Sequence, residues 1–224
     1  MTLTIADLSY ELLEEIDKPN HYKELATKVR AIKKIKDSKS VLSALHTDNR
    51  FVKLGKGVYG LRNWLLEGAL FIINPSRAQV KRNILSINNY EYLFPNNKIE
   101  LNYNNQSYRY NLKNNRIKKV CFYDSFNLTN LLIKVNDIER SSYTIIDKNI
   151  KFDGNQLYNQ LIVEILKSKG VKTAKNLIKE VLILAYKRNK LEALFPLLPI
   201  REVVDQLPQV YEPVVGLFKF NHNY

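Results

Sequence analysis

The stretch from Ser38 to Trp64, SKSVLSALHTDNRFVKLGKGVYGLRNW, constrains the fold most, because its hydrophobic period changes from helical to strand-like. Apolar residues first recur at helical spacing and predict a helix over 38–49. From Phe51 onward the period is two, and Gly55-Lys56-Gly57 supplies the backbone freedom of a tight hairpin turn. A helix with a small, polar, basic face followed by a lysine-bearing hairpin predicts a winged helix-turn-helix.

Two further helices are predicted before this stretch. Residues 4–16 begin at a candidate N-cap, Thr4, and carry one apolar stripe opposite an acidic face. Residues 21–31 predict the second helix. The segment that follows is crowded with lysines, and a loop of that composition within a helix-turn-helix is well placed to contact backbone phosphate.

The residues of this N-terminal segment resemble a known family. HYKELATKV, followed by VLSALHTDNRFVKLGKGVYGLRNW, is similar to the HARE-HTH winged-helix domain, over roughly residues 4–64. Its most specific part is the hairpin signature, which comprises Asp48-Asn49-Arg50-Phe51, Leu54-Gly55, Val58-Tyr59-Gly60-Leu61 and Trp64. The family occurs in chromatin and restriction-associated proteins and in the bacterial RNA polymerase delta subunit. The resemblance therefore implies a winged helix with a DNA- or transcription-linked role.

The remainder of the chain predicts an α+β protein with three domains. Beyond a winged helix over residues 1–66, a connector helix (77–87) and five short strands (99–150) predict a small β-barrel or curved antiparallel sheet over 67–152. Asn104-Asn105 and Asn114-Asn115 stand where its turns are needed. Cations alternate there with tyrosines, for which a structural role is favoured over base stacking. Residues 153–224 predict a helical hairpin and an apolar tail, a candidate homodimer contact.

Charge narrows the partners. The 224 residues carry a net charge of +13, and each third of the chain holds more Lys and Arg than Asp and Glu. This balance fits a polyanionic partner such as double-stranded DNA, although a lysine-rich solvated surface also explains it. The single cysteine, Cys121, excludes an internal disulfide framework and is expected to be a buried core thiol. Without an apolar run long enough to span a bilayer, we expect a cytoplasmic, nucleoid-associated protein.

Catalysis is not expected. The candidate carboxylate clusters, Asp137 with Glu139 and Asp153 with Glu164, lack the Asp…Glu-x-Lys spacing of restriction-type nucleases. The three histidines have no metal-ligand spacing, and no glycine-rich phosphate loop is present. The sequence therefore predicts no enzyme, no metal and no cofactor.

The leading hypothesis is a non-catalytic, transcription-related DNA-binding protein. The helix over 38–49 would enter the major groove, while the wing and the preceding loop would contact phosphate. The residues expected to contact DNA are Lys33, Lys34, Lys36, Lys39, Ser40, Ser43, His46, Thr47, Lys53 and Lys56. Two alternatives stay open: a module that docks on RNA polymerase, and the DNA-reading subunit of a restriction or defence system with a separate nuclease subunit.

Overall fold

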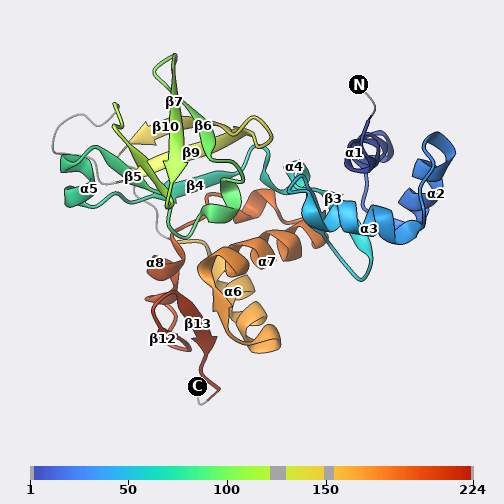
Figure 1. The fold of residues 1–224 in the computed structure, drawn as a ribbon. Helices are drawn as coiled ribbons and strands as arrows, with labels where there is room; N and C mark the ends of the chain where they lie inside the picture. Colours follow the sequence, from blue (N-terminus) through green and yellow to red (C-terminus); the bar gives the residue numbers. More distant parts are fainter. Residues whose placement is uncertain (1–2, 122–129, 149–153, 223–224) are drawn as a thin grey trace. The chain divides into compact units, whose positions relative to one another are not determined.

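A computed structural model describes residues 3–121, 130–148 and 154–222, and the chain forms two compact units, residues 1–65 and 66–224. The first unit contains the elements of a winged helix, labelled in Figure 1: α1 (Ile5–Ile16), β1 (Asn20–His21), α2 (Tyr22–Ile32), α3 (Ser38–Thr47), β2 (Phe51–Lys53) and β3 (Val58–Leu61). Its antiparallel sheet has the strand order β1-β3-β2. The predicted helix-turn-helix and wing are confirmed.

Local side-chain chemistry sets the helix boundaries of this unit. The Thr4 hydroxyl accepts a hydrogen bond from the Asp7 amide, and the Asp7 carboxylate accepts one from the Thr4 amide, so α1 begins with a capping box. His21 caps α2 through its imidazole, and Asp37 caps α3 through its carboxylate. The apolar stripes of the three helices then meet in one core, which contains the fully buried Leu13, Leu25, Val29, Val41 and Leu61.

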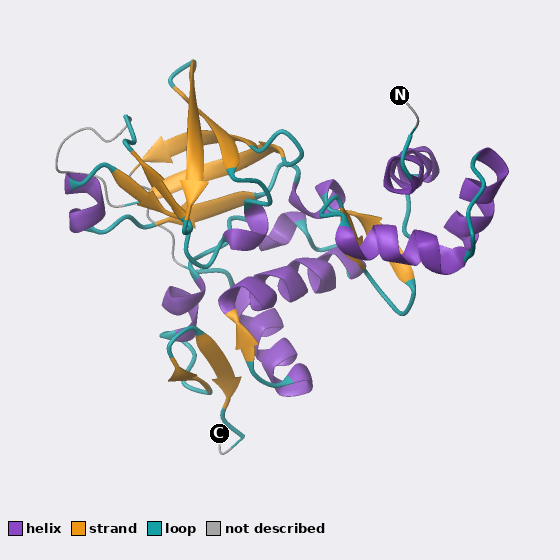
Figure 2. Cartoon of the chain, in the orientation of Figure 1, coloured by secondary structure: helices purple, strands orange, loops and turns teal. Residues whose placement is uncertain are grey.

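The second unit begins with a curled sheet, drawn in orange in Figure 2. Its strands are β4 (Leu70–Ile73), β5 (Ile84–Ser86), β6 (Lys98–Tyr103), β7 (Gln106–Lys113), β8 (Arg116–Lys118), β9 (Leu131–Asp137) and β10 (Ser142–Lys148). They are ordered β4-β9-β10-β6-β7-β8-β5, and every adjacent pair is antiparallel except β10 and β6, which are parallel. The curved sheet is confirmed, with two strands more than the five predicted. Short helical segments at α4 (Asn63–Leu66), α5 (Arg77–Lys81) and η1 (Glu91–Leu93) connect the strands.

Two expectations for this region are wrong. The predicted helix over 77–87 ends at Lys81, and Asn83, with a φ of 52°, turns the chain into β5. Cys121 is exposed rather than buried, because it follows the end of β8 and lies beyond the sheet core. The asparagine turns are confirmed: Asn104, Asn105, Asn114 and Asn115 all have φ between 49° and 60°, which asparagine tolerates better than most residues. The predicted strand positions Phe122 and Tyr123 lie outside the described residues.

The C-terminal part of the second unit repeats the element order of the first. It contains α6 (Gln156–Lys169), β11 (Lys172–Thr173), α7 (Ala174–Lys187), η2 (Glu192–Leu194), α8 (Ile200–Val204), β12 (Val210–Val214) and β13 (Leu217–Phe220). The sheet order β11-β13-β12, all antiparallel, matches β1-β3-β2 (Figure 1). Residues 156–220 are therefore a second winged helix, where the sequence predicted a helical hairpin and a tail. The apolar tail is its wing.

The two winged helices correspond residue by residue at their shared strands. His21 pairs with Val58 and caps α2, and Thr173 pairs with Leu217 and caps α7. The next residue along each wing strand is a buried aromatic, Tyr59 or Phe218. The buried faces of α2 and α7 also coincide, with Leu25, Ala26 and Val29 in one and Leu177, Ile178 and Val181 in the other. The same core positions are filled in both.

The second winged helix shares a core with the curled sheet. Leu197, in the segment before α8, pairs with Phe71 at the edge strand β4 through two backbone hydrogen bonds of 2.8 and 2.9 Å. The buried Tyr90 hydroxyl donates to the carbonyls of Ile72 and Leu197, so it joins the two parts. Burial raises the pKa of Tyr90 well above its usual value, which keeps the phenol a donor.

Candidate nucleic-acid interface

The exposed stripe of α3 is formed by Lys39, Ser43, His46 and Thr47, at helical spacing. Val41 and Leu45 lie on the opposite side and are buried in the core of the first unit. Because the stripe consists mainly of short polar side chains and one lysine, another macromolecule can approach the helix backbone closely. Four of the five α3 positions predicted to contact DNA therefore share one accessible face.

Two predicted contact residues have structural partners instead. Ser40 is half-buried, and its amide and hydroxyl both donate hydrogen bonds to the Asp37 carboxylate that caps α3. Lys33 is also half-buried, and its ammonium donates to the Leu3 carbonyl at the start of the chain. Ser40 therefore fixes the start of the helix, and Lys33 holds the N-terminal segment.

His46 is exposed, but its orientation is set by the wing. Its Nε2 atom lies 2.8 Å from the Tyr59 hydroxyl, and the two rings meet edge to face with centroids 5.5 Å apart. Tyr59 belongs to β3, so this contact ties the C-terminal end of α3 to the wing. Burial raises the pKa of the Tyr59 phenol, which stays protonated at neutral pH. Tyr59 was not predicted to have this role; its place in the Val58–Leu61 signature was the available signal.

The wing turn is held rigidly at its base. Gly57 has a φ of 73°, and a Cβ atom there would collide with the His21 imidazole that caps α2. Its carbonyl accepts a 2.9 Å hydrogen bond from the Tyr22 amide. Lys56 stands exposed at the tip of this anchored turn, and Lys53 is exposed at the end of β2. Glycine at position 57 is therefore needed both for the turn and for its contact with α2.

Arg50 connects three parts of the first unit and was not predicted as an interface residue. Its guanidinium pairs with Asp48 at 2.7 Å and with Asp7 at 2.9 Å, and it lies over the Tyr10 ring. The hydrogen bonds from Thr4, followed by the one from Arg50, lower the pKa of the Asp7 carboxyl to about 2. The Asp-Asn-Arg-Phe signature thus fixes the entry into β2 against α1, and Arg50 is not available for phosphate.

Five exposed lysines of the predicted set remain: Lys34, Lys36, Lys39, Lys53 and Lys56. Within described residues 3–65, the ion pairs at 2.7 and 2.9 Å are both made by Arg50, and none of these lysines is neutralised by a carboxylate. Unpaired lysines are strongly hydrated point charges that can neutralise phosphate and release its counterions. The predicted surface is neither folded inward nor covered by acidic side chains.

The catalytic candidates do not assemble into a site. Asp137 caps the β9–β10 turn by accepting from the amides of Glu139 and Arg140, and Glu164 pairs with Arg188. Asp153 lies outside the described residues. No group of three or more His, Cys, Asp or Glu side chains that could hold a metal ion occurs in the part of the chain that the structure describes.

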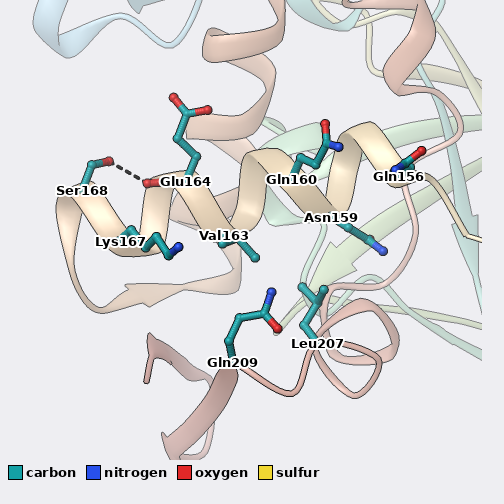
Figure 3. A pocket seen from close by; sticks show the side chains of 9 residues that line it. All are labelled: Gln156, Asn159, Gln160, Val163, Glu164, Lys167, Ser168, Leu207 and Gln209. Carbon is teal, nitrogen blue, oxygen red and sulfur yellow. Dashed lines mark hydrogen bonds between the residues drawn. The ribbon is translucent and has the colours of Figure 1, made fainter. Parts of the chain in front are cut away.

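A hollow of about 590 Å³ occurs on the second winged helix, between α6 and the connection from α8 to β12 (Figure 3). The residues that line it are Gln156, Asn159, Gln160, Val163, Glu164, Lys167, Ser168, Leu207 and Gln209. Gln209 directly precedes β12, as Arg50 directly precedes β2. Gln160 and Asp7 are likewise at the same distance along the chain from the C-cap residues of α6 and α1. The hollow thus lies where the Arg50–Asp7 pair fills the first winged helix.

Three helices, an antiparallel sheet and a lysine-tipped wing define the N-terminal unit as a winged helix-turn-helix domain. Residues 3–64 match the family model of the HARE-HTH domain, whose description names ASXL and the restriction endonuclease HTH domain, so this segment is a HARE-HTH domain. The match supports DNA binding by this segment. No curated protein and no solved structure matches the chain. Among the described residues, no helix is long and apolar enough to cross a membrane.

Proposed function

We propose that this chain is a non-catalytic, transcription-related DNA-binding protein that lays α3 in the major groove of a duplex. The observation that carries the proposal is the set of five exposed, unpaired lysines around α3 and the wing. Lys39 lies on the helix, Lys34 and Lys36 precede it, and Lys53 and Lys56 flank the wing turn. In winged helices these are the places from which the groove and its flanking phosphates are reached.

The composition of α3 indicates which contacts contribute most. Ser43 and Thr47 are short, and Thr47 already donates its hydroxyl to the Ser43 carbonyl. Arginine paired to guanine is the commonest specific base contact, and the exposed stripe has none. We therefore expect phosphate contacts to supply most of the affinity and α3 to supply modest sequence preference.

The test is to replace Lys34, Lys53 and Lys56 together by glutamate and to measure duplex binding by fluorescence anisotropy across a salt series. With about five phosphates neutralised, the native chain should show a log–log salt slope of roughly −4 to −5. The triple variant should lose duplex binding by the N-terminal unit at about 0.1 M salt. Unchanged affinity and slope, with an unchanged unfolding curve, would refute the assignment of this face.

A second candidate rests on the same arginine-free stripe. A small, polar helix face also fits a protein groove, so the winged helix could dock on RNA polymerase rather than on DNA. Co-purification with polymerase that survives nuclease treatment, combined with duplex binding that the triple variant does not weaken, would favour that function.

A further inference from the structure

A second group of cations occurs on the curled sheet. Strands β6, β7 and β8 contain five lysines and arginines, Lys98, Arg109, Lys113, Arg116 and Lys118, and all five are exposed. Pairing shows that they lie on one face: Arg109 is opposite Glu100, Lys113 is opposite Arg116, and Lys98 is opposite Asn111. The buried residues Ile99, Leu101 and Ile117 alternate with them and point into the core. We call these five residues the cationic sheet face.

Little negative charge opposes this face. Glu100 is the one carboxylate in the sequences of the three strands, and it pairs with Arg109 at 3.2 Å. The Arg109 side chain is nevertheless 88% exposed. Lys98, Lys113, Arg116 and Lys118 have no carboxylate partner among the described residues. The potential of this surface is therefore not cancelled locally.

Uncharged hydrogen-bonding groups extend the face across β10 and β9. Asn102 of β6 donates to the Ser142 hydroxyl, and Asn136 of β9 donates to the Thr144 hydroxyl at 2.8 Å. Beside Arg109, a shallow hollow of about 460 Å³ is lined by Lys98, Glu100, Asn111 and Arg140 among others. Amide and hydroxyl groups next to cations are the side chains that proteins use to contact sugar and phosphate.

The position of the aromatic residues selects the kind of nucleic acid. Tyr108 and Tyr110 pair with Leu101 and Ile99, so they lie on the side of the sheet opposite the cations, with ring centroids 6.4 Å apart. The interleaving of cations and tyrosines in the sequence therefore does not place them on one surface. Proteins that bind single strands stack bases on aromatic rings, and none of the β6, β7 or β8 residues on the cationic sheet face is aromatic. Duplex phosphate is the ligand that fits.

We propose that the cationic sheet face is a second contact surface for double-stranded DNA, which it binds through backbone phosphates without reading sequence. Its chemistry differs from that of α3, since cations on adjacent strands and a polar ladder replace a groove-entering helix. Because it is made of other residues, this surface contributes affinity independently of the N-terminal winged helix. The full chain then has more phosphate contacts than its HARE-HTH domain supplies.

The experiment uses the full chain with Lys113, Arg116 and Lys118 replaced by glutamine. The matched control replaces Lys175, Lys187 and Lys190, which are also exposed, by glutamine, and so removes the same charge elsewhere in the second unit. On a duplex of about 30 base pairs and arbitrary sequence, the sheet variant should bind about 10- to 100-fold more weakly at about 0.1 M salt. Its salt slope should be shallower by roughly 2 to 3, while the control should match the native chain.

Two further measurements separate this inference from the proposed function. In a chain whose Lys34, Lys53 and Lys56 are already replaced by glutamate, residual salt-dependent duplex binding should remain and should disappear when the sheet substitutions are added. If the sheet variant binds like the native chain, or if the control loses as much affinity, the cationic sheet face is refuted whatever the winged-helix variant does. A larger loss on a single strand of the same sequence than on the duplex would also overturn it.

Discussion

In the N-terminal winged helix the second and third helices are joined by residues 33–37, a loop in which Lys34 and Lys36 are exposed. In the C-terminal winged helix the same connection runs over residues 188–199, and Leu197 within it is bonded to β4. One copy leaves its helix-turn-helix connection free for a partner, whereas the other uses it to join a sheet.

The third helices differ in the same sense. α3 has ten residues and an exposed polar stripe, whereas α8 has five, of which Ile200, Val203 and Val204 are buried. Its two outward side chains are engaged, since Arg201 pairs with Glu212 of the wing and Glu202 accepts from Asn74. A helix this short and this engaged cannot lie in a major groove. The comparison teaches that a winged-helix topology carries no interface by itself; exposed side chains decide.

The wings carry opposite chemistry. The N-terminal wing has Lys53 and Lys56 around its turn, whereas the C-terminal wing exposes Val214 and Val215, the latter at 86%. Glu212, whose pKa is lowered by the Gly216 amide and by Arg201, adds negative charge there. The C-terminal wing therefore offers phosphate little attraction, and duplex binding should not depend on it.

The largest expected effect tests whether the two cores are equivalent. Leu25→Ala and Leu177→Ala each remove a fully buried side chain from the matching turn of α2 or α7. Each should lower the free energy of unfolding of its own unit by about 2–5 kcal/mol. Hydrogen exchange resolved by residue would assign each loss, and a Leu177→Ala variant that unfolds like the native chain would break the correspondence.

The wing glycines should separate the two copies. Gly57→Ala combines a positive φ with a collision against His21, so it should cost about 2–4 kcal/mol. Gly216→Ala has a φ of 81° but no atom within 4 Å of the added Cβ, so it should cost about 1 kcal/mol. Chemical denaturation of the two variants measures the difference, and equal losses would show that His21 does not brace the N-terminal wing.

The acidic residue behind Arg50 gives a pH signature to the N-terminal copy. The folded-state pKa of Asp7, about 2, is below its unfolded value, so the stabilisation is present above about pH 4. It should be lost as the pH falls through about 2. A carboxyl titration by NMR should find this low pKa in the native chain and a return toward about 4 in Arg50→Ala together with Thr4→Ala.

The smallest effect comes from transferring the ion pair. Gln160→Asp with Gln209→Arg would place the counterparts of Asp7 and Arg50 beside the hollow on α6. Because the pair would be largely exposed, we expect a stabilisation of roughly 0.5–1 kcal/mol and near-neutral single variants. Thermal unfolding of the double-mutant cycle measures the coupling; a coupling of zero would mean that the two segments are aligned differently.

The sequence was most informative where local chemistry decides the structure. Turn glycines, N-caps and the Val58–Leu61 signature located the N-terminal winged helix, because Gly60 is in close contact with Trp64 and no larger residue fits. The second copy was missed because its third helix has five residues and a long connection, residues 188–199, precedes it. Tertiary contacts also decided which predicted residues are free: Ser40 and Lys33 hold the fold, and only coordinates reveal such partners.

The pairing of Leu197 with β4 has a practical consequence for dissecting the chain. A cut between the sheet and α6 would strip β4 of its covering segment and leave the Tyr90 hydroxyl without one of its two acceptors. The sheet half should then self-associate through its bared edge. Residues 66–224 therefore have to be expressed as one piece, whereas the break between residues 65 and 66 falls between compact units.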